Sequence, residues 1–88
     1  MTIQEYERQR AEKRFQDGVE ADSANALDRA TEAFGDAEER FHLLGDVKRV
    51  ADSSSMLADV YRQKNQLEQA VVSYQRAMKL YQDVLIGP

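Results

Sequence analysis

The side chains that could support chemistry are few in this sequence, and their spacing limits what they can do. His42 is the only histidine among the 88 residues, and there is no cysteine. A protein zinc site needs several nitrogen, sulfur or carboxylate ligands at close spacing. One histidine among scattered carboxylates therefore predicts no metal site and no cofactor. We expect His42 to be a partly exposed residue near the end of a helix.

Three carboxylates in the middle of the chain are the best candidates for acid–base chemistry. At helical spacing, Asp36 and Glu39 fall opposite the aromatic residues Phe34 and Phe41, and Glu38 falls at the edge of the apolar stripe. This arrangement is typical of a solvated helix face. The sequence also lacks a glycine-rich phosphate loop, a nucleophile elbow and a zinc-protease motif. We therefore expect a protein without enzymatic activity.

A run of three serines, residues 53–55, is the one low-complexity spot in the chain. It has two interpretations: a phosphorylatable stretch, or small residues at which two helices pack. We favour packing, because Ser54 falls at a position that would face the neighbouring helix.

Composition bounds the class of protein. Apolar residues make up 42% and charged residues 32% of the chain, and the net charge is −4 without a basic block. This predicts one globular domain without affinity for nucleic acid or anionic membranes. The N-terminal stretch "MTIQEYERQR" is polar, and the longest aliphatic run, residues 84–86, is too short to cross a bilayer. The expected location is the cytoplasm.

The rarity of helix breakers predicts an all-α fold. Glycine occurs four times, and the single proline is the last residue. Polar joints at 22–25 and 64–66 contain Asn25 and Asn65, which tolerate a left-handed conformation, and Gly45 in the joint at 44–46 does so as well. We expect four helices near residues 3–22, 25–44, 47–64 and 66–84, arranged as two antiparallel hairpins.

Two stretches 40 residues apart share a pattern of small and aromatic residues: "ATEAFGDAEERF" and "AVVSYQRAMKLY". Aligned, they pair Ala30 with Ala70, Phe34 with Tyr74, Ala37 with Ala77 and Phe41 with Tyr81. Steps of three and four residues describe one face of an α-helix. Because small and bulky residues recur at the same places, we interpret the pair as an internal repeat and expect Tyr74 to be buried.

The segment "LADVYRQKNQLEQAVVSYQRA" resembles a tetratricopeptide repeat. The residues that carry the resemblance are Leu57, Ala58, Tyr61, Ala70, Tyr74 and Ala77, with Ala58 in place of the usual glycine. The first unit is similar at Gly18, Ala30, Phe34 and Ala37, whereas Asp17 and Ala21 stand where leucine and tyrosine are usual. The spacing of 40 residues exceeds the family's common length of about 34.

The resemblance implies two stacked helical hairpins, a fragment of an α-solenoid. We expect one helical-repeat domain over residues 1–88, with repeat unit 1 at about 3–44 and repeat unit 2 at about 47–84. Small residues at Gly18, Ala30, Ala37, Ala58, Ala70 and Ala77 would let the helix axes approach closely. One hairpin cannot bury its apolar face alone, so such units stack.

The resemblance also implies a concave groove, lined by the first helix of each hairpin, that binds a partner protein or peptide. The residues expected to line it are Phe15, Val19, Asp22, Asp52, Ser55, Asp59 and Arg62. Glu12, Asp52 and Asp59 give this groove an acidic character, which favours a basic or amphipathic partner. Ordinary solvent-facing charges are the alternative explanation of these residues.

The last helix has more apolar residues than one buried face can hold. Val71, Met78 and Leu85 recur every seven residues, and Val72 points to the far side. These four residues are the candidate oligomer interface, because a contiguous exposed apolar patch commonly marks a contact surface. A second copy in a two-fold homodimer is the simplest cover, and a helix of a partner protein is the alternative. The sequence thus predicts a protein-interaction module, with a self-assembling scaffold as the alternative function.

Overall fold

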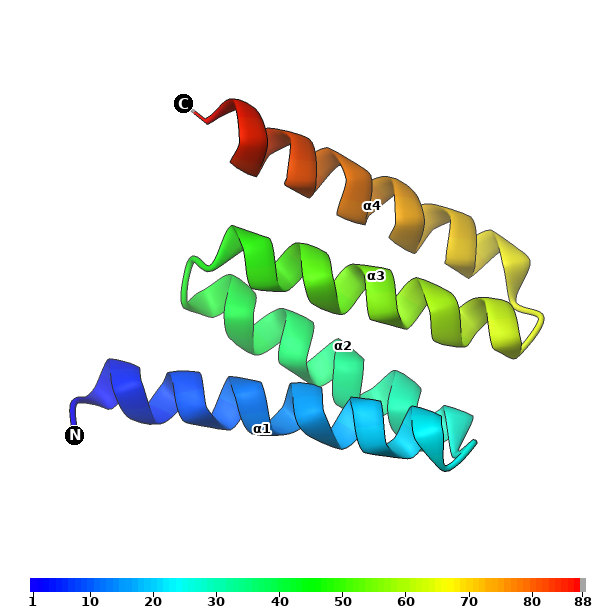
Figure 1. Cartoon of the computed structure of the whole chain (residues 1–88), viewed down its shortest axis with the longest axis horizontal. Helices are drawn as coiled ribbons and strands as arrows, with labels where there is room; N and C mark the ends of the chain where they lie inside the picture. The colour runs from blue at the N-terminus through cyan, green and yellow to red at the C-terminus, as the bar shows by residue number, and fades with distance from the viewer. Residues whose placement is uncertain (88) are drawn as a thin grey trace.

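The computed structural model describes residues 1–87, which form four α-helices joined by three-residue turns. The helices are α1 (Ile3–Ser23), α2 (Leu27–Leu43), α3 (Val47–Gln63) and α4 (Leu67–Ile86). Each helix runs antiparallel to the one before it and packs against its neighbours in the chain (Figure 1). The predicted all-α fold of two consecutive antiparallel pairs is confirmed.

The three turns have the same geometry, repeated every 20 residues. Asn25, Gly45 and Asn65 follow the three helix ends with φ of 57°, 72° and 62°. The next backbone N–H in each turn donates to a carbonyl in the last turn of the preceding helix, at 2.8, 3.0 and 2.8 Å. Left-handed residues with these bonds are a common way to end a helix. Asn and Gly at these positions therefore set the helix length locally.

The first turn lies slightly later than the sequence predicted. Asp22 and Ser23 were expected in the joint, but both belong to the last turn of α1, and the turn comprises residues 24–26. The Asp22 carbonyl accepts the Asn25 N–H at 2.9 Å, which keeps Asp22 helical. The other predicted boundaries differ from the observed ones by two residues at most.

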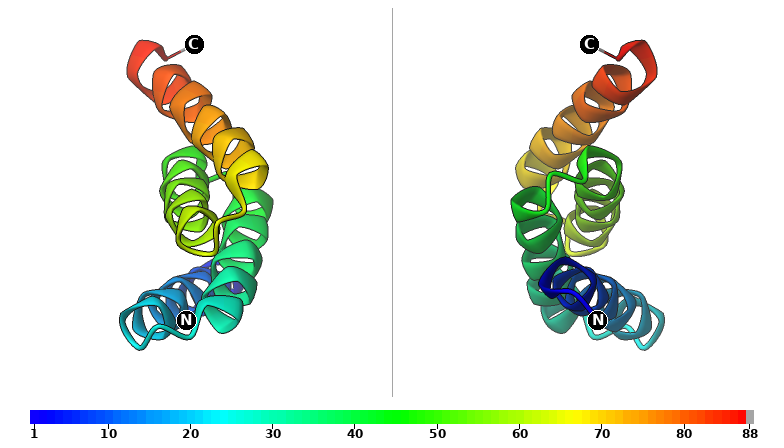
Figure 2. Two further views of the ribbon diagram at one scale, coloured as in Figure 1. Left: turned by 90° about the vertical axis from the view of Figure 1, so that its right-hand side faces the viewer. Right: turned by 90° about the vertical axis from the view of Figure 1, so that its left-hand side faces the viewer.

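The helices form one curved layer with dimensions of 39 × 30 × 15 Å. Seen along the layer in Figure 2, α1 and α3 lie on one side, while α2 and the beginning of α4 lie on the other. We call the side formed by the first helix of each pair the α1–α3 face. Within residues 1–87, no helix has the length and apolar character needed to span a membrane.

Small residues allow the close helix contacts that the repeat predicted. All six predicted small positions are buried. They are Gly18, Ala30, Ala37, Ala58, Ala70 and Ala77. Gly18 gives the tightest contact: a Cβ atom there would lie 2.7 Å from the ring of Phe34, so α1 and α2 can only approach this closely with glycine at this position.

The aromatic residues of the repeat differ in burial. Phe34 and Phe41 on α2 have no exposed surface. Tyr74 and Tyr81, at the equivalent positions on α4, are only half-buried. The prediction that Tyr74 is buried is therefore wrong. The reason is the number of close neighbours, since α2 packs extensively against both α1 and α3, whereas α4 packs extensively only against α3. Its contact with α2 is smaller and includes Arg76, 3.8 Å from Glu38.

Candidate functional site

The centre of the α1–α3 face is a charged network around Arg49 of α3. Its guanidinium donates to Glu12 of α1 at 3.1 and 2.6 Å and to Asp52 at 2.9 Å. It also lies 4.1 Å from the ring centroid of Phe15 and 5.0 Å from that of Phe41. Partial burial works against its charge, but the bonds to both carboxylates hold the pKa of Arg49 above its ordinary value. Arg49 therefore joins α1, α2 and α3 at one point.

Sequence reasoning missed Arg49, because its role depends on residues that only the fold brings together. The two ends of the same face carry further links, from α1 to the turn before α3 at one end and to α3 at the other. Arg8 pairs with Asp46 at 2.6 Å, and Gln63 donates to Asp22 at 3.0 Å. The face is thus held along its length by polar contacts between α1 and α3.

The seven residues predicted to line the groove divide into two groups. Phe15 and Val19 are half-buried and pack into the core beside Phe34 rather than lying open. Asp22, Asp52 and Asp59 accept hydrogen bonds from neighbouring helices. Ser55 is half-buried and Arg62 is exposed. The structure therefore places all seven on α1 and α3, and Arg62 is the most exposed of them.

Two tyrosines of α4 bond to these aspartates, a contact that the sequence did not indicate. The Tyr74 hydroxyl donates to Asp59 and the Tyr81 hydroxyl donates to Asp52. Burial and the bond to Asp52 raise the pKa of Tyr81 to about 12. Asp52 is also partly buried, but bonds from Tyr81, Arg49 and Lys48 keep its pKa below the ordinary value. The carboxylates of α3 therefore help to hold α4 in place.

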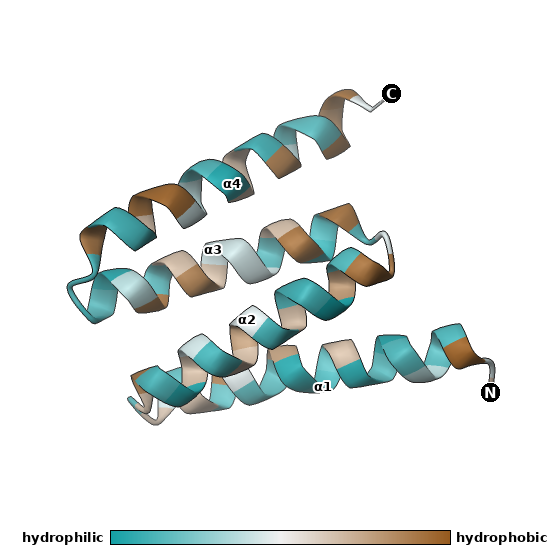
Figure 3. Cartoon of the chain, turned by 180° about the vertical axis from the view of Figure 1, so that it is seen from behind, coloured by the Kyte–Doolittle hydropathy of each residue, from teal (hydrophilic) through white to brown (hydrophobic). Residues whose placement is uncertain are grey.

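The second predicted surface, on α4, is exposed. Val71, Val72, Met78 and Leu85 expose 53%, 64%, 61% and 85% of their surface, and Leu67 is exposed beside them. At 100° per residue, Leu67, Val71, Met78 and Leu85 lie on one flank of the helix, whereas Val72 lies elsewhere. Figure 3 shows apolar residues along the length of α4, while α1 is mainly hydrophilic.

The first repeat shows what such a flank normally contacts. Leu27 and Glu38 of α2 stand 40 residues before Leu67 and Met78. Leu27 packs against a core cluster that contains Leu57 and Val60 of α3 as well as Ala30 and Phe34 of α2 itself. Glu38 accepts a hydrogen bond from Ser54 of α3. The flank of α4 therefore corresponds to the part of α2 that another helix covers.

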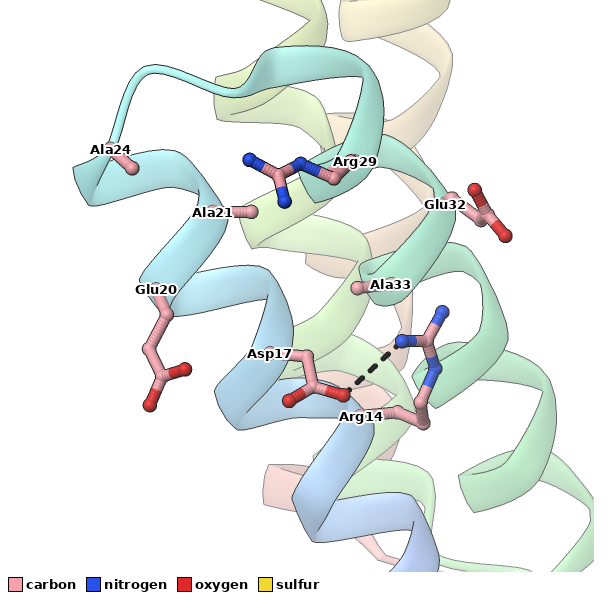
Figure 4. Close-up of a pocket in the computed structure, with 8 residues that line it drawn as sticks. All are labelled: Arg14, Asp17, Glu20, Ala21, Ala24, Arg29, Glu32 and Ala33. Atoms are coloured by element: carbon pink, nitrogen blue, oxygen red, sulfur yellow. Dashed lines mark hydrogen bonds and ion pairs between the residues drawn. The ribbon is translucent and has the colours of Figure 1, made fainter.

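The opposite end of the layer is different, because a charged groove of about 500 Å3 runs between α1 and α2. Figure 4 shows its lining, with Arg14 bonded to Asp17 at 3.2 Å. Arg14 also donates to Asp36 at 2.8 Å, and Arg40 donates to the same carboxylate at 3.0 Å. Despite partial burial, these bonds lower the pKa of Asp36. Of the charged residues that line the groove, Arg14 and Asp17 are paired with each other.

These contacts correct the prediction of a fully solvated acidic face. Glu39 is exposed, as expected, but Asp36 is half-buried in the arginine network. Glu38 is half-buried as well and accepts the Ser54 hydroxyl. The favoured packing role of the serine run is confirmed, because Ser53 and Ser54 have no exposed surface. His42 is exposed on the last turn of α2.

Residues 1–87 contain no group of three or more histidine, aspartate or glutamate side chains that could hold a metal ion. A family model described as "Soluble NSF attachment protein, SNAP" matches residues 1–84. No curated protein and no solved structure matches the chain.

Proposed function

Because the chain belongs to the soluble NSF attachment protein family, we propose that it is an adaptor that binds NSF and SNARE proteins. Proteins of this family are non-catalytic adaptors, and their fold is a helical repeat similar to the tetratricopeptide repeat. The family is therefore not the tetratricopeptide-repeat family that the residues resembled, although the two share the helical-repeat architecture. The observation that carries the proposal is the family match over residues 1–84.

Two further parts of the proposal concern organisation and location. We infer one domain over residues 1–88, with repeat units at about 3–44 and 47–84; the regular 20-residue spacing of the three turns supports it. We also infer that the chain acts in the cytoplasm and reaches membranes through SNARE proteins, as proteins of this family do.

The α1–α3 face is the surface that we infer for partner binding. It is polar, and it includes the strip of Ser55, Asp59 and Arg62 on α3, of which Arg62 is exposed. Within this strip, Asp59 and Arg62 carry opposite charges 3.7 Å apart, and Asp22 adds an acidic side chain on α1. Charges at the rim of an interface mainly set the association rate and its salt dependence. A basic or amphipathic segment of the partner protein fits this surface.

Binding to purified NSF and to an assembled SNARE complex tests the proposal, measured by isothermal titration calorimetry at two salt concentrations. The variant is Asp59→Asn, which removes a charge on the α1–α3 face but can still accept the Tyr74 hydroxyl. Asp28→Asn is the matched control, because Asp28 is an exposed aspartate on α2, away from that face.

We expect Asp59→Asn to weaken binding about fivefold or more, as rim charges do, and Asp28→Asn to leave it unchanged. Absence of binding to both partner preparations would contradict the adaptor function. Equal effects of the two variants would contradict the assignment of the binding face to α1 and α3.

The alternative function, a self-assembling scaffold, is favoured by a different observation: the exposed apolar flank of α4. It requires contacts between copies of this chain rather than with another protein. The adaptor function uses α1 and α3, whereas the scaffold function uses α4.

A further inference from the structure

An open groove of about 370 Å3 lies between the end of α2, the beginning of α3 and the second half of α4. We call it the α3–α4 groove. Its apolar lining is formed by a buried, a half-buried and an exposed side chain, and its three basic side chains are all exposed. The apolar residues are Val50, Leu80 and Val47, and the basic residues are His42, Arg76 and Lys79. No acidic residue of the described chain lines this groove.

The α3–α4 groove lies away from the two surfaces described above. Val50 of the groove is about 200° around α3 from Asp52 of the α1–α3 face, and Leu80 is about 200° around α4 from Met78 of the exposed apolar flank. Figures 1 and 2 show that α4 leans away from α3 toward its C-terminal end, where the groove lies. A helix that packed on the exposed flank of α4 would therefore leave the groove open.

The first hairpin has a different lining at the same place. Val50 and Leu80 stand 40 residues after Arg10 and Arg40. Both arginines line a smaller groove of about 230 Å3 between α1 and α2, where Arg40 donates to Asp36 at 3.0 Å. The same place is thus charged in one hairpin and apolar in the other. The repeat does not require an apolar groove here, so its apolar side chains are available to a ligand.

The size and lining of the α3–α4 groove suit a small ligand group. Ligand sites have volumes of about 300–1,000 Å3 and are mostly apolar, with a few polar groups that fix the orientation of the ligand. The groove, at about 370 Å3, lies at the lower end of this range. It therefore has room for one or two large side chains of a partner protein.

The charges of the groove select the partner's chemistry. Lys79 and His42 are in no ion pair within residues 1–87. Arg76 lies 3.8 Å from Glu38, and half of its side chain is exposed. The nearest acidic residue along α4 is Asp83, one turn beyond Lys79, and it is in no ion pair either. The groove is thus a basic site on a chain with a net charge of −4.

We propose that the α3–α4 groove binds a short acidic segment of a partner protein, in which large aliphatic side chains adjoin carboxylates. The aliphatic side chains contact Val47, Val50 and Leu80, and the carboxylates accept hydrogen bonds from Lys79 and Arg76. A basic segment would meet like charges at this site, which costs free energy. This site goes beyond the adaptor function and uses another surface, since that function is assigned to the α1–α3 face.

Nuclear magnetic resonance tests the site, with the amide shifts of the 15N-labelled 88-residue chain recorded during titration with three peptides. The first is acetyl-Glu-Glu-Leu-Leu-Glu-amide. The second has lysine in place of each glutamate, and the third has serine in place of each leucine. We expect saturable shifts in residues 42–50 and 76–80 with the first peptide only, and a dissociation constant in the low millimolar range.

The basic peptide makes this test specific. Because the net charge of the chain is −4, attraction that is not specific to a site would favour the lysine peptide. A preference for the glutamate peptide is therefore a property of the groove.

Two charge reversals locate the binding. Lys79→Glu should weaken binding of the glutamate–leucine peptide about threefold or more, as the loss of an exposed ion pair does. Arg29→Glu is the matched control, because Arg29 is an exposed cation of α2 outside the α3–α4 groove and its reversal changes the net charge equally. The control should bind as the unmodified chain does, and circular dichroism should show unchanged helicity in both variants.

Four outcomes would overturn the proposal: no shifts with the glutamate–leucine peptide, equal binding of the lysine or the serine peptide, shifts confined to the α1–α3 face, or equal weakening by the two variants. Neither NSF nor a SNARE protein takes part in this experiment, so its failure would leave the adaptor function untouched.

Discussion

α2 and α4 occupy the same place in the two copies of the repeat, but their aromatic residues have different surroundings. Phe34 and Phe41 are fully buried between two neighbouring helices. Tyr74 and Tyr81 have a helix on one side only, and their hydroxyls bond to Asp59 and Asp52. A phenol suits a position that is apolar on one side and open on the other. The repeat thus determines where the helices lie, whereas the number of neighbours determines how much of each is buried.

Truncation of one aromatic residue on each helix should show the difference between α2 and α4 most clearly. Phe34→Ala should lower the free energy of unfolding by about 3–5 kcal/mol, because it leaves a cavity in the core. The free energy of unfolding of a domain of this size is about 5–10 kcal/mol in total. Phe34→Ala should therefore be largely unfolded only slightly above room temperature. Tyr74→Ala should cost about half as much, since part of its ring is exposed without truncation. Urea unfolding measures both, and equal losses would contradict the difference between α2 and α4.

The contact between α1 and α2 can be tested with two glycines. Gly18→Ala should destabilise the chain by about 1–3 kcal/mol, because the added Cβ would lie 2.7 Å from the Phe34 ring. Gly35→Ala on α2 is the control, because nothing lies within 4 Å of an added Cβ there. That control should stabilise the helix by about 0.5–1 kcal/mol. Thermal unfolding followed by circular dichroism should show opposite shifts in Tm; shifts in the same direction would argue against the close approach.

The α1–α3 face should be sensitive at Arg49. Arg49→Lys keeps the charge but loses the two-point contact with Glu12 and the planar contact with Phe15, so we expect a loss of about 1–2 kcal/mol. Arg62→Lys, on the exposed end of the same helix, should change stability by less than about 0.5 kcal/mol. Urea unfolding compares the two variants. A loss for Arg49→Lys as small as for Arg62→Lys would show that the network does not hold the helices together.

The smallest expected effect concerns pH. The folded pKa of Tyr81 is about 12, above the value of about 10 for an unfolded chain. The unfolded chain therefore loses this proton first, so the contribution of Tyr81 is complete below about pH 10 and is lost as the pH rises toward 12. Tyr81→Phe should reduce this dependence to the part that Tyr74 contributes, because the bond to Asp59 raises the pKa of Tyr74 as well. Tyr6→Phe, at an exposed residue of α1, should retain the dependence in full. The measurement is the urea concentration at the midpoint of unfolding, determined from neutral to alkaline pH for the unmodified chain and the two variants. The same dependence on pH in all three proteins would contradict the Tyr81–Asp52 contact.

The features that the sequence predicted correctly are those set by nearby residues. The helix ends follow from Asn25, Gly45 and Asn65, which act within their own turns. The burial of the small residues follows from their spacing along one face of each helix. The contacts that were missed join long side chains across different helices, as Arg49 does with Glu12 and Tyr81 with Asp52. Helical spacing gives the face on which a side chain lies, but it does not give the partner that the side chain reaches.

Asp52 shows this limit at the candidate site. Its place on the α1–α3 face was predicted from the repeat, and the structure puts it there. Its carboxylate, however, accepts bonds from Arg49, Lys48 and Tyr81, so it serves the packing of α4 as well as the charge of the face.

The difference between α2 and α4 is tested most directly by amide hydrogen exchange, measured on the unmodified chain at low concentration. At low concentration, we expect the amides of α4 to exchange much faster than those of α2, because α4 is covered on one side only. Protection in α4 that equals that of α2 would contradict the difference in burial between the two helices.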